Sequence, residues 1–402
     1  MASSYSQYYD GNLDNNGNGH NDSTGYNDSD YYGYDYTYEY EQFPMQAFKF
    51  EQPLNIFILF LVFLTSFFNI VIMSVLLRRS MRIPTNIIFV AIAVADSLSG
   101  LVMVPTYIYI YSTPHKGYHV LTKGWCNFFM MSKFFLSRYF HTVSIWLTLF
   151  LGFQRFVCVI FPFKAKDFFT MIKTMIAIGA LFLLAPILHL YHLLDEKTDY
   201  GMCSWSIEQP CVKTCVYFWL EVLLMHMGPG IMLIIFTSYM LKGLTKSRRK
   251  TSQPNTLLDS KNLDATSKAK NSENRRLSLI VVTLVIVFLI PEVPYGLYLL
   301  IFTCYQHAGK KLMTLETNRI LHNVYEVLLL LSFHANFWIY TVMNKRFRSA
   351  LADYIKPLKK FIRRTTGGEV SVTQPGSSTE GRTFDSELNS TMATEMKPVQ
   401  NN

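Results

Sequence analysis

Seven long apolar segments run along the chain and alternate with shorter polar ones. Each contains at least the ~20 residues that a helix needs to cross the hydrocarbon core of a bilayer. Because the backbone finds no water partners in lipid, such segments satisfy their hydrogen bonds internally, as helices do. The pattern predicts an all-α membrane protein, a seven-transmembrane helix bundle. The segments are approximately Leu54–Leu77, Pro84–Tyr111, Trp125–Phe161, Met171–Leu194, Cys215–Leu241, Leu277–Thr303 and Ile320–Met343.

The third segment is the longest, and we expect it to form the central helix. A helix from Cys126 to Arg155 would be roughly 43 Å long. This exceeds the ~30 Å hydrocarbon core, so the helix must tilt and extend into both interfaces. Arg155 stands at its inner end, where an arginine is costly unless it has a function or a route to water.

Lysine and arginine gather in the loops that follow the odd-numbered segments. Arg78, Arg79 and Arg82 follow the first, and a longer basic loop follows the fifth. Positive charge stays on the cytoplasmic side of membranes, so we expect the N-terminus outside and the C-terminus inside. Asn21 and Asn27 each begin an acceptor pattern for N-glycosylation, which agrees with this orientation.

The chain divides into four parts. Residues 1–50 are rich in Asn, Gly, Asp, Ser and Tyr and are predicted to be a disordered extracellular tail. Residues 51–344 form the bundle and residues 363–402 a disordered cytoplasmic tail. Between them, residues 345–362 place apolar side chains at helical spacing among Lys and Arg, which predicts an amphipathic helix 8 on the anionic membrane surface.

Composition supports a membrane protein and weighs against other classes. The 402 residues are 50% hydrophobic and only 16% charged, whereas soluble proteins carry about 25% charged residues. The net charge of +9 lies mainly in the loops, which favours membrane orientation over binding of nucleic acid. The sequence contains no HExxH, GxSxG or phosphate-loop motif, so we expect no enzyme activity. It also lacks an internal repeat and a selectivity-filter motif, which weighs against the alternatives of a transporter or a channel.

Several residues match, in order, the landmarks of one receptor family. They are Asn69 in the first segment, Asn86 and Asp96 in the second, Cys126 and Gln154-Arg155-Phe156 in the third, Pro229 in the fifth, Phe288 and Pro294 in the sixth, and Asn336 to Tyr340 in the seventh. On these residues the chain resembles the rhodopsin-like (class A) G-protein-coupled receptors over about residues 54–358. The resemblance implies a plasma-membrane receptor that passes ligand binding to heterotrimeric G proteins.

Departures from that family's pattern narrow the resemblance. Gln154 stands where the family usually has an acid, Glu292 stands where it usually has a tryptophan, and NFWIY lacks the usual proline. The third segment is also one turn longer than usual. Together these features resemble the invertebrate neuropeptide receptors grouped with myosuppressin, FMRFamide-type and sex-peptide (myoinhibitory-peptide) receptors. The implied ligand is an amidated neuropeptide, with a non-peptide ligand as the alternative.

Polar residues in the outer halves of four segments would line the ligand cavity of such a receptor. A peptide ending in Arg-Phe-amide needs an acid for its guanidinium and aromatic surfaces for its ring. Glu221, Glu292 and Glu326 are the candidate acids, and Glu292 would be protonated or face Arg138 or a ligand cation. Any of these groups could instead pair with another and hold helices together. The candidate ligand residues are Arg138, His141, Glu221, Glu292, His322, Tyr325 and Glu326.

The resemblance assigns residues at the inner ends to activation. Arg155 and Tyr340 would face the cavity that opens toward the G protein. Gln154 offers Arg155 only a neutral hydrogen bond, which is weaker than a charge-assisted one, so we expect basal activity or a compensating partner. Phe163 would contact the G protein or anchor its loop at the interface. The activation residues are Gln154, Arg155, Phe156, Phe163, Phe288, Pro294, Asn336 and Tyr340.

Asp96 is an ionisable residue inside a span, which marks a functional site. In the family it lies in a sodium pocket, and the matching neighbours here are Asn69, Ser144, Ser332 and Asn336. The alternative is a protonated or water-bonded carboxyl that joins helices. No cofactor other than this sodium ion is expected.

Cys126 faces Cys203, Cys211 and Cys215 in the second extracellular loop, where an oxidising environment favours a disulfide. We expect Cys203, in a short hairpin strand, to be the partner, with Cys211 as the alternative. Cys304 could form a second bridge.

Further partners follow from the cytoplasmic tail. Serines and threonines there stand among acidic residues, and their phosphorylation by a receptor kinase would create an anion suited to an arrestin. Membrane lipid is the expected partner of helix 8, and no nucleic acid is expected.

Overall fold

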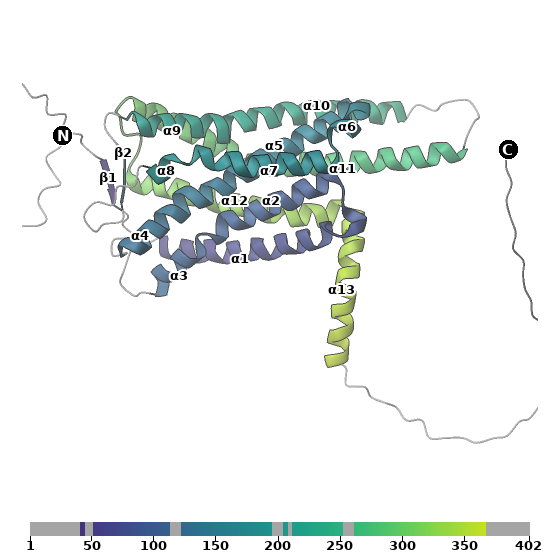
Figure 1. Ribbon diagram of the computed structural model, residues 1–402, viewed down its shortest axis with the longest axis horizontal. Helices are drawn as coiled ribbons and strands as arrows, with labels where there is room; N and C mark the ends of the chain where they lie inside the picture. The colour runs from purple at the N-terminus through teal and green to yellow at the C-terminus, as the bar shows by residue number, and fades with distance from the viewer. Residues whose placement is uncertain are drawn as a thin grey trace, which may run out of the picture.

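The computed structural model describes residues 41–44, 51–112, 122–194, 204–207, 211–251 and 261–366. Within these ranges, seven helical segments are long and apolar enough to cross a membrane, which confirms the seven predicted spans. They lie side by side as one bundle (Figure 1). The spans are Pro53–Leu76, Pro84–Tyr109, Gly124–Ile160, Met171–Leu188, Lys213–Lys246, Ser272–His307 and Glu316–Met343.

The fourth span is shorter than predicted. It ends at Leu188 instead of Leu194, and a separate short helix, α8 (Tyr191–Leu194), follows it. Pro186 lies in the last turn and has no backbone N–H to continue the helical hydrogen bonds. The apolar sequence runs on past this point, so hydropathy alone could not mark the end.

Several spans combine more than one helical element. The elements of the spans are α1 (Glu51–Leu76); α2 (Pro84–Leu101) and α3 (Val104–Ser112); α4 (Lys123–Met130), η3 (Met131–Ser137) and α5 (Arg138–Ile160); α7 (Met171–Leu188); α9 (Lys213–Glu221), η4 (Val222–Met227) and α10 (Gly228–Thr251); α11 (Lys261–His307); and α12 (Leu315–Met343). The loops add η1 (Arg79–Met81) and α6 (Pro162–Phe168), and α13 (Lys345–Thr366) follows the last span.

The elements η3 and η4 are π-helices, whose turns are wider than those of an α-helix. η3 lies in the third span, where the sequence is longer than expected, and it absorbs part of that excess. η4 ends at Gly228, whose N–H bonds the Leu223 carbonyl. A Cβ at Gly228 would lie 2.2 Å from that oxygen, so the π turn requires glycine there.

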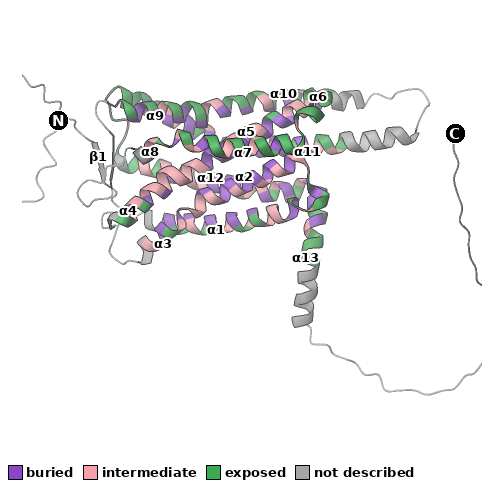
Figure 2. Cartoon of the chain, in the orientation of Figure 1, coloured by how far each residue is buried: buried purple, intermediate pink, exposed green. Residues whose placement is uncertain are grey.

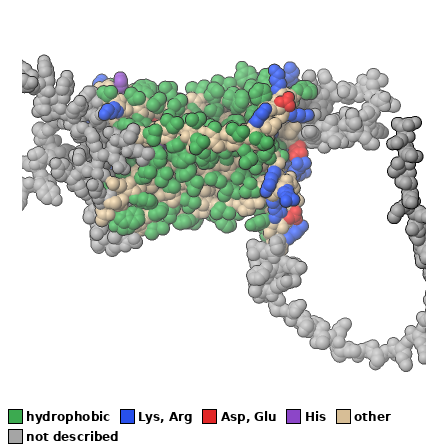
Figure 3. Space-filling model, viewed as in Figure 1, with side chains coloured by type: hydrophobic (Ala, Val, Ile, Leu, Met, Phe, Trp, Pro, Cys, Tyr) green, Lys and Arg blue, Asp and Glu red, His purple; other side chains and the backbone are tan. Residues whose placement is uncertain are grey.

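The helix α5 is the centre of the bundle, as the sequence predicts. It packs against α2, α7, α10 and α11, and Leu147 and Leu151 on it belong to the main buried core. Buried residues face the inside of the bundle (Figure 2). Apolar residues also cover the outer surface, as a lipid-facing surface requires (Figure 3).

Charge is distributed unevenly over the described surface. Lys and Arg side chains gather at the end of the bundle where α13 begins, whereas the belt between the two ends is apolar (Figure 3). This is the end that the sequence assigns to the cytoplasm by its basic loops. We call it the basic end.

Two short strands add to the all-α architecture. β1 (Glu41–Pro44) pairs antiparallel with β2 (Ser204–Ile207), with Glu41 opposite Ile207 and Pro44 opposite Ser204. The predicted strand after Cys203 is therefore present, but its partner is the N-terminal segment and not an adjacent hairpin strand. β1 lies within residues 1–50, for which the sequence predicted only disorder.

A further helix, α13, follows the last span. It runs from Lys345 to Thr366 and leaves the bundle at a steep angle to the spans (Figure 1); its identity with the predicted amphipathic helix 8 stays a prediction. Phe347 in its first turn is fully buried and contacts the rings of Phe337 and Tyr340. Its contact with a membrane surface stays a prediction.

Candidate functional site

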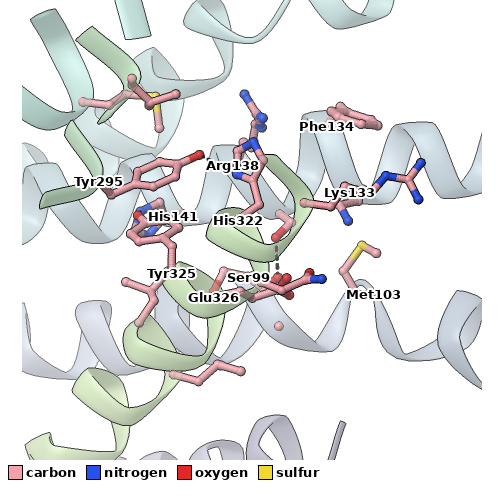
Figure 4. A pocket seen from close by; sticks show the side chains of 18 of the residues that line it. Ser99, Met103, Lys133, Phe134, Arg138, His141, Tyr295, His322, Tyr325 and Glu326 are labelled. Carbon is pink, nitrogen blue, oxygen red and sulfur yellow. Dashed lines mark hydrogen bonds between the residues drawn. The ribbon is translucent and has the colours of Figure 1, made fainter. Parts of the chain in front are cut away.

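A cavity of about 270 Å³ lies among the outer halves of the spans, away from the basic end. Side chains from η3, α5, α11 and α12 converge on it (Figure 4). Six of the seven predicted ligand residues line it, namely Arg138, His141, Glu221, His322, Tyr325 and Glu326. The cavity also contains side chains that the sequence did not single out, including Lys133, Phe134 and Tyr295.

Glu292 is not among the residues that line the cavity, and its role as a ligand residue stays a prediction. Its side chain is buried and held by three groups. His226 Nδ1 lies 2.8 Å from Oε2, the Tyr325 hydroxyl donates to Oε1 at 2.9 Å, and His141 Nε2 lies 3.3 Å from Oε1. A buried carboxylate is costly without such partners. The alternative of polar groups that pair and hold helices together applies here.

Arg138 pairs with Glu221 and not with Glu292. Its Nη1 donates to Glu221 Oε1 at 2.7 Å and to the Tyr217 hydroxyl at 3.3 Å. The guanidinium lies 5.6 Å from the centre of the Phe134 ring. The Glu221 side chain is buried, whereas that of Arg138 is 24% exposed. This pair joins α5 to α9 and leaves part of the guanidinium facing the cavity.

Aromatic rings from α11 and α12 pack against each other in the lining of the cavity. Tyr295 and Tyr325 stack with ring centres 3.6 Å apart, and the Tyr295 hydroxyl lies 2.8 Å from His322 Nδ1. Tyr295 was missed, although it stands one helical turn after Glu292 and that spacing could have identified it. His226 was also missed. It is five residues after Glu221, and the π turn brings both onto one face, which α-helical periodicity does not predict.

Asp96 lies deeper in the bundle and is fully buried. The Ser144 hydroxyl donates to Asp96 Oδ1, and Asn336 Nδ2 lies 3.4 Å from Oδ2. Two other predicted neighbours bond elsewhere: Asn69 donates to Ser97 at 3.1 Å, and Ser332 faces the Val287 carbonyl at 3.5 Å. The carboxylate and hydroxyl oxygens suit a hard cation such as sodium.

Arg155 is buried at the inner end of α5. Its Nη2 donates to the Thr85 hydroxyl, which in turn donates to Gln154 Oε1 at 3.0 Å. Thr85 therefore supplies the compensating partner that replaces the missing acid. Arg155 Nε and the Tyr340 hydroxyl have no hydrogen-bond partner among the described residues.

In this structure Arg155 and Tyr340 do not line an inner cavity, and their exposure to a G protein stays a prediction. Both side chains are buried, with exposed fractions of 4% and 1%. A cavity of about 350 Å³ does exist at the basic end, but its lining, which includes Asn86, Arg276 and Arg346, excludes both residues. Tyr340 instead packs on the Phe89 ring at 4.8 Å. The inner end of the bundle is closed around Arg155.

The other predicted activation residues differ in how far they are buried. Phe288 is buried in the main core, and Pro294 lies inside α11, which continues past it. Phe156 stacks on Phe236 with ring centres 5.3 Å apart. Phe163 on α6 is 89% exposed, which leaves it available to a partner or to the membrane interface.

A comparison with models of known protein families shows which class of membrane protein this seven-helix bundle belongs to. The model described as "7 transmembrane receptor (rhodopsin family)" matches residues 47–340, which include the first six spans and all but the last three residues of the seventh. The chain belongs to this family. It is therefore a multi-pass membrane receptor of the G-protein-coupled type, with a ligand and a G protein as its partners, and members of this family are receptors and not enzymes.

Two curated proteins are similar to this receptor over most of its length. The "Sex peptide receptor-related protein 2" of Caenorhabditis elegans is 23% identical over 311 residues, which cover 72% of this chain and 68% of the relative. The "Sex peptide receptor" of Drosophila melanogaster is 25% identical over 317 residues, which cover 73% and 70%. These are the invertebrate receptors that the departures in the sequence resemble.

At the basic end of the receptor, two contacts join the inner end of α11 to the end of α12 and the start of α13. Arg276 Nε donates to the Met343 carbonyl at 2.5 Å, at the end of α12. Glu273 Oε1 lies 2.5 Å from Nη1 of Arg346 on α13. We call these two contacts the α11 tie. It holds the inner end of the sixth span, and it does not involve Arg155.

The receptor also contains a disulfide that was not expected. Cys211 is bonded to Cys215, so the alternative that Cys211 pairs with Cys126 is wrong. Cys126 is itself in a disulfide, and Cys203 lies outside the described residues, so their pairing stays a prediction. Cys304 is a free thiol, and no second bridge involves it. Asn21 and Asn27 also lie outside the described residues.

Proposed function

We propose that this receptor binds an amidated neuropeptide in the outer cavity and activates a heterotrimeric G protein at the basic end. The observation that carries the proposal is the lining of the cavity, where acidic, basic and aromatic side chains from several spans meet. A peptide offers charged groups, amides and rings at once, and each finds a complementary group there. The two relatives are named as receptors for a peptide, or as related to one.

The proposal includes a plasma-membrane location with the N-terminus outside. Its support is the gathering of Lys and Arg at the basic end, since positive charge is retained in the cytoplasm. On this orientation, α13 lies against the anionic inner leaflet through its basic side chains. The tail after it, which is outside the described residues, receives the receptor kinase and an arrestin.

The proposal also includes an allosteric sodium ion at Asp96. The residues that would hold it are Asp96, Ser144 and Asn336, whose side chains already meet, with Ser332 nearby on the same helix as Asn336. Bound there, the ion would neutralise the buried carboxylate and favour the resting packing of the spans. Without the ion, the buried carboxyl group of Asp96 is stabilised by a proton or by its hydrogen bonds to Ser144 and Asn336.

The experiment that tests the function is a screen of amidated peptides. Cells that express the receptor with a promiscuous G protein are exposed to the library, and intracellular calcium is recorded. A response to an amidated peptide that untransfected cells lack is expected. Silence toward all amidated peptides, together with ion flux through the protein in liposomes without a G protein, would instead support a transporter or channel.

A further inference from the structure

The outer cavity contains one acid that the protein does not already use. Glu221 is in an ion pair with Arg138 at 2.7 Å, and Glu292 lies behind the wall with His226, His141 and Tyr325 around it. Both carboxylates are therefore engaged before any ligand arrives. A ligand group that needed either of them would first have to displace a protein partner.

Glu326 differs from the other two acids. It lies on α12 and lines the cavity, half-buried, and its side chain is drawn among those that converge on the cavity in Figure 4. Within the described part of the chain, no hydrogen bond or ion pair engages its carboxylate. A carboxylate in such a place is a strong acceptor for a donor that a ligand brings.

Lys133 is the charged neighbour of Glu326. It stands on η3, lines the same cavity, and acts electrostatically on the Glu326 carboxylate. Its ammonium also lies 5.7 Å from the centre of the Phe129 ring. This corner of the cavity thus offers an anionic acceptor and a cationic donor beside an aromatic ring.

We propose that Glu326 and Lys133 recognise the terminal carboxamide of the peptide. The inference rests on the proposed function and assigns residues to one part of that ligand. A carboxamide has two N–H groups and a carbonyl oxygen, so its N–H groups can donate to Glu326 while its oxygen accepts from Lys133. A free carboxylate has no N–H to donate and would carry a negative charge against Glu326.

The same pair argues against a guanidinium at this position. Lys133 lines the same cavity as Glu326, and a second cation bound beside it would be repelled by its ammonium. A neutral group with a donor and an acceptor fits both charges at once. An aromatic ring next to the carboxamide would lie along Phe129 and Phe134, which line this part of the cavity.

The test uses the most potent amidated peptide of the screen and the otherwise identical free-acid peptide. The amide-to-acid potency ratio is measured on the wild-type receptor and on Glu326→Gln, with the amount at the cell surface determined for both. The wild type should prefer the amide. In Glu326→Gln the amide should lose at least about tenfold in potency and the acid should not, so the ratio shrinks by at least about tenfold.

Glu221→Gln is the matched control, because it removes an acid that lines the same cavity but is engaged by Arg138. It should weaken both peptides by the same factor and leave the ratio unchanged. If Glu326→Gln also weakens both equally, Glu326 acts on another part of the peptide or on the fold, and the assignment is overturned. If the wild type responds to no amidated peptide, the proposed function itself fails, and the assignment fails with it.

Discussion

The buried carboxylate of Glu292 depends on three donors from three other helical elements. His226 comes from η4, His141 from α5 and Tyr325 from α12. A single acid on α11 therefore joins four spans at one point. Here a hydrogen-bond network and not apolar packing joins these helices.

Replacing Glu292 with leucine should destabilise the receptor markedly. The substitution removes the acceptor of the His226 ring and one partner of the Tyr325 hydroxyl, which keeps only His141 Nε2 at 2.8 Å, and each unsatisfied buried group costs about 1–3 kcal/mol. We expect a loss of about 2–5 kcal/mol in the free energy of unfolding, measured as a lower Tm of the detergent-purified receptor. Tyr325→Phe removes one donor and should cost about 1 kcal/mol. Equal Tm values for all three proteins would contradict the network.

Asp96 offers a second prediction at the scale of one residue. Asp96→Asn keeps the shape but removes the charge that would attract sodium, so agonist affinity should become insensitive to sodium chloride relative to a choline control. In the wild type, sodium should weaken agonist binding several-fold, since the ion favours the resting state. Ser97→Ala is the matched control: Ser97 bonds Asn69 and not Asp96. Undiminished sodium sensitivity in Asp96→Asn would exclude the ion site.

Among the helical elements, α11 is the one whose movement we expect to accompany activation. It contains Phe288, Glu292 and Pro294, and its inner end is held by the α11 tie to Met343 and Arg346. Proline removes one backbone hydrogen bond and lets a helix bend. Activation by movement of the inner end of α11 would have to break the tie, because the tie joins it to α12 and α13.

Arg276→Ala should therefore raise signalling in the absence of ligand. It removes the part-buried hydrogen bond to the Met343 carbonyl, and a hydrogen bond from a charged group contributes about 1.5–3 kcal/mol. Since 1.4 kcal/mol is tenfold in an equilibrium constant, basal activity should rise by at least about tenfold at equal surface expression. Arg275→Ala, at the neighbouring exposed arginine, should leave it unchanged. Equal basal activity in both variants would show that the tie does not restrain α11.

The π turn of η4 gives a prediction for the fifth span. A methyl group at Gly228 would lie 2.2 Å from the Leu223 carbonyl oxygen, so Gly228→Ala should unwind the π turn and rotate His226 away from Glu292. We expect agonist potency to fall about tenfold, which corresponds to a loss of about 1.4 kcal/mol. Gly230→Ala is the control, because its nearest neighbour would be 4.0 Å away. If the two variants behave alike, the width of this turn does not matter to the site.

The seven spans could be predicted because each is a long apolar run bounded by charged or polar residues. The side-chain pairs in the cavity could not. Arg138 and Glu221 were both candidates, but their pairing depends on how α5 and α9 are rotated against each other, and no local pattern encodes that rotation. The contacts of Glu292 with His226, His141 and Tyr325 depend on helix rotation in the same way. Lys133 and His226 lie on or beside π turns, whose spacing differs from the 3.6-residue period used to read helices.

At the scale of the whole molecule, the receptor has a cavity among the outer halves of its spans, whereas Arg155 and Tyr340 are buried at its inner end. The outer cavity is lined by polar and aromatic side chains. Asp96 and Glu292 lie in the spans between them, each bonded to neighbouring helices. On the proposed function, ligand binding in the outer cavity would have to change the packing around Arg155 and Tyr340.

The most direct measurement is nucleotide exchange on a G protein by the purified receptor. The receptor is reconstituted in liposomes with a panel of heterotrimeric G proteins, and exchange is followed with and without the amidated peptide from the screen. The account predicts that the peptide accelerates exchange on at least one G protein, and that Arg276→Ala raises the rate without peptide. The contradicting result would be exchange at the background rate on every G protein, both without peptide and with peptide bound to the receptor.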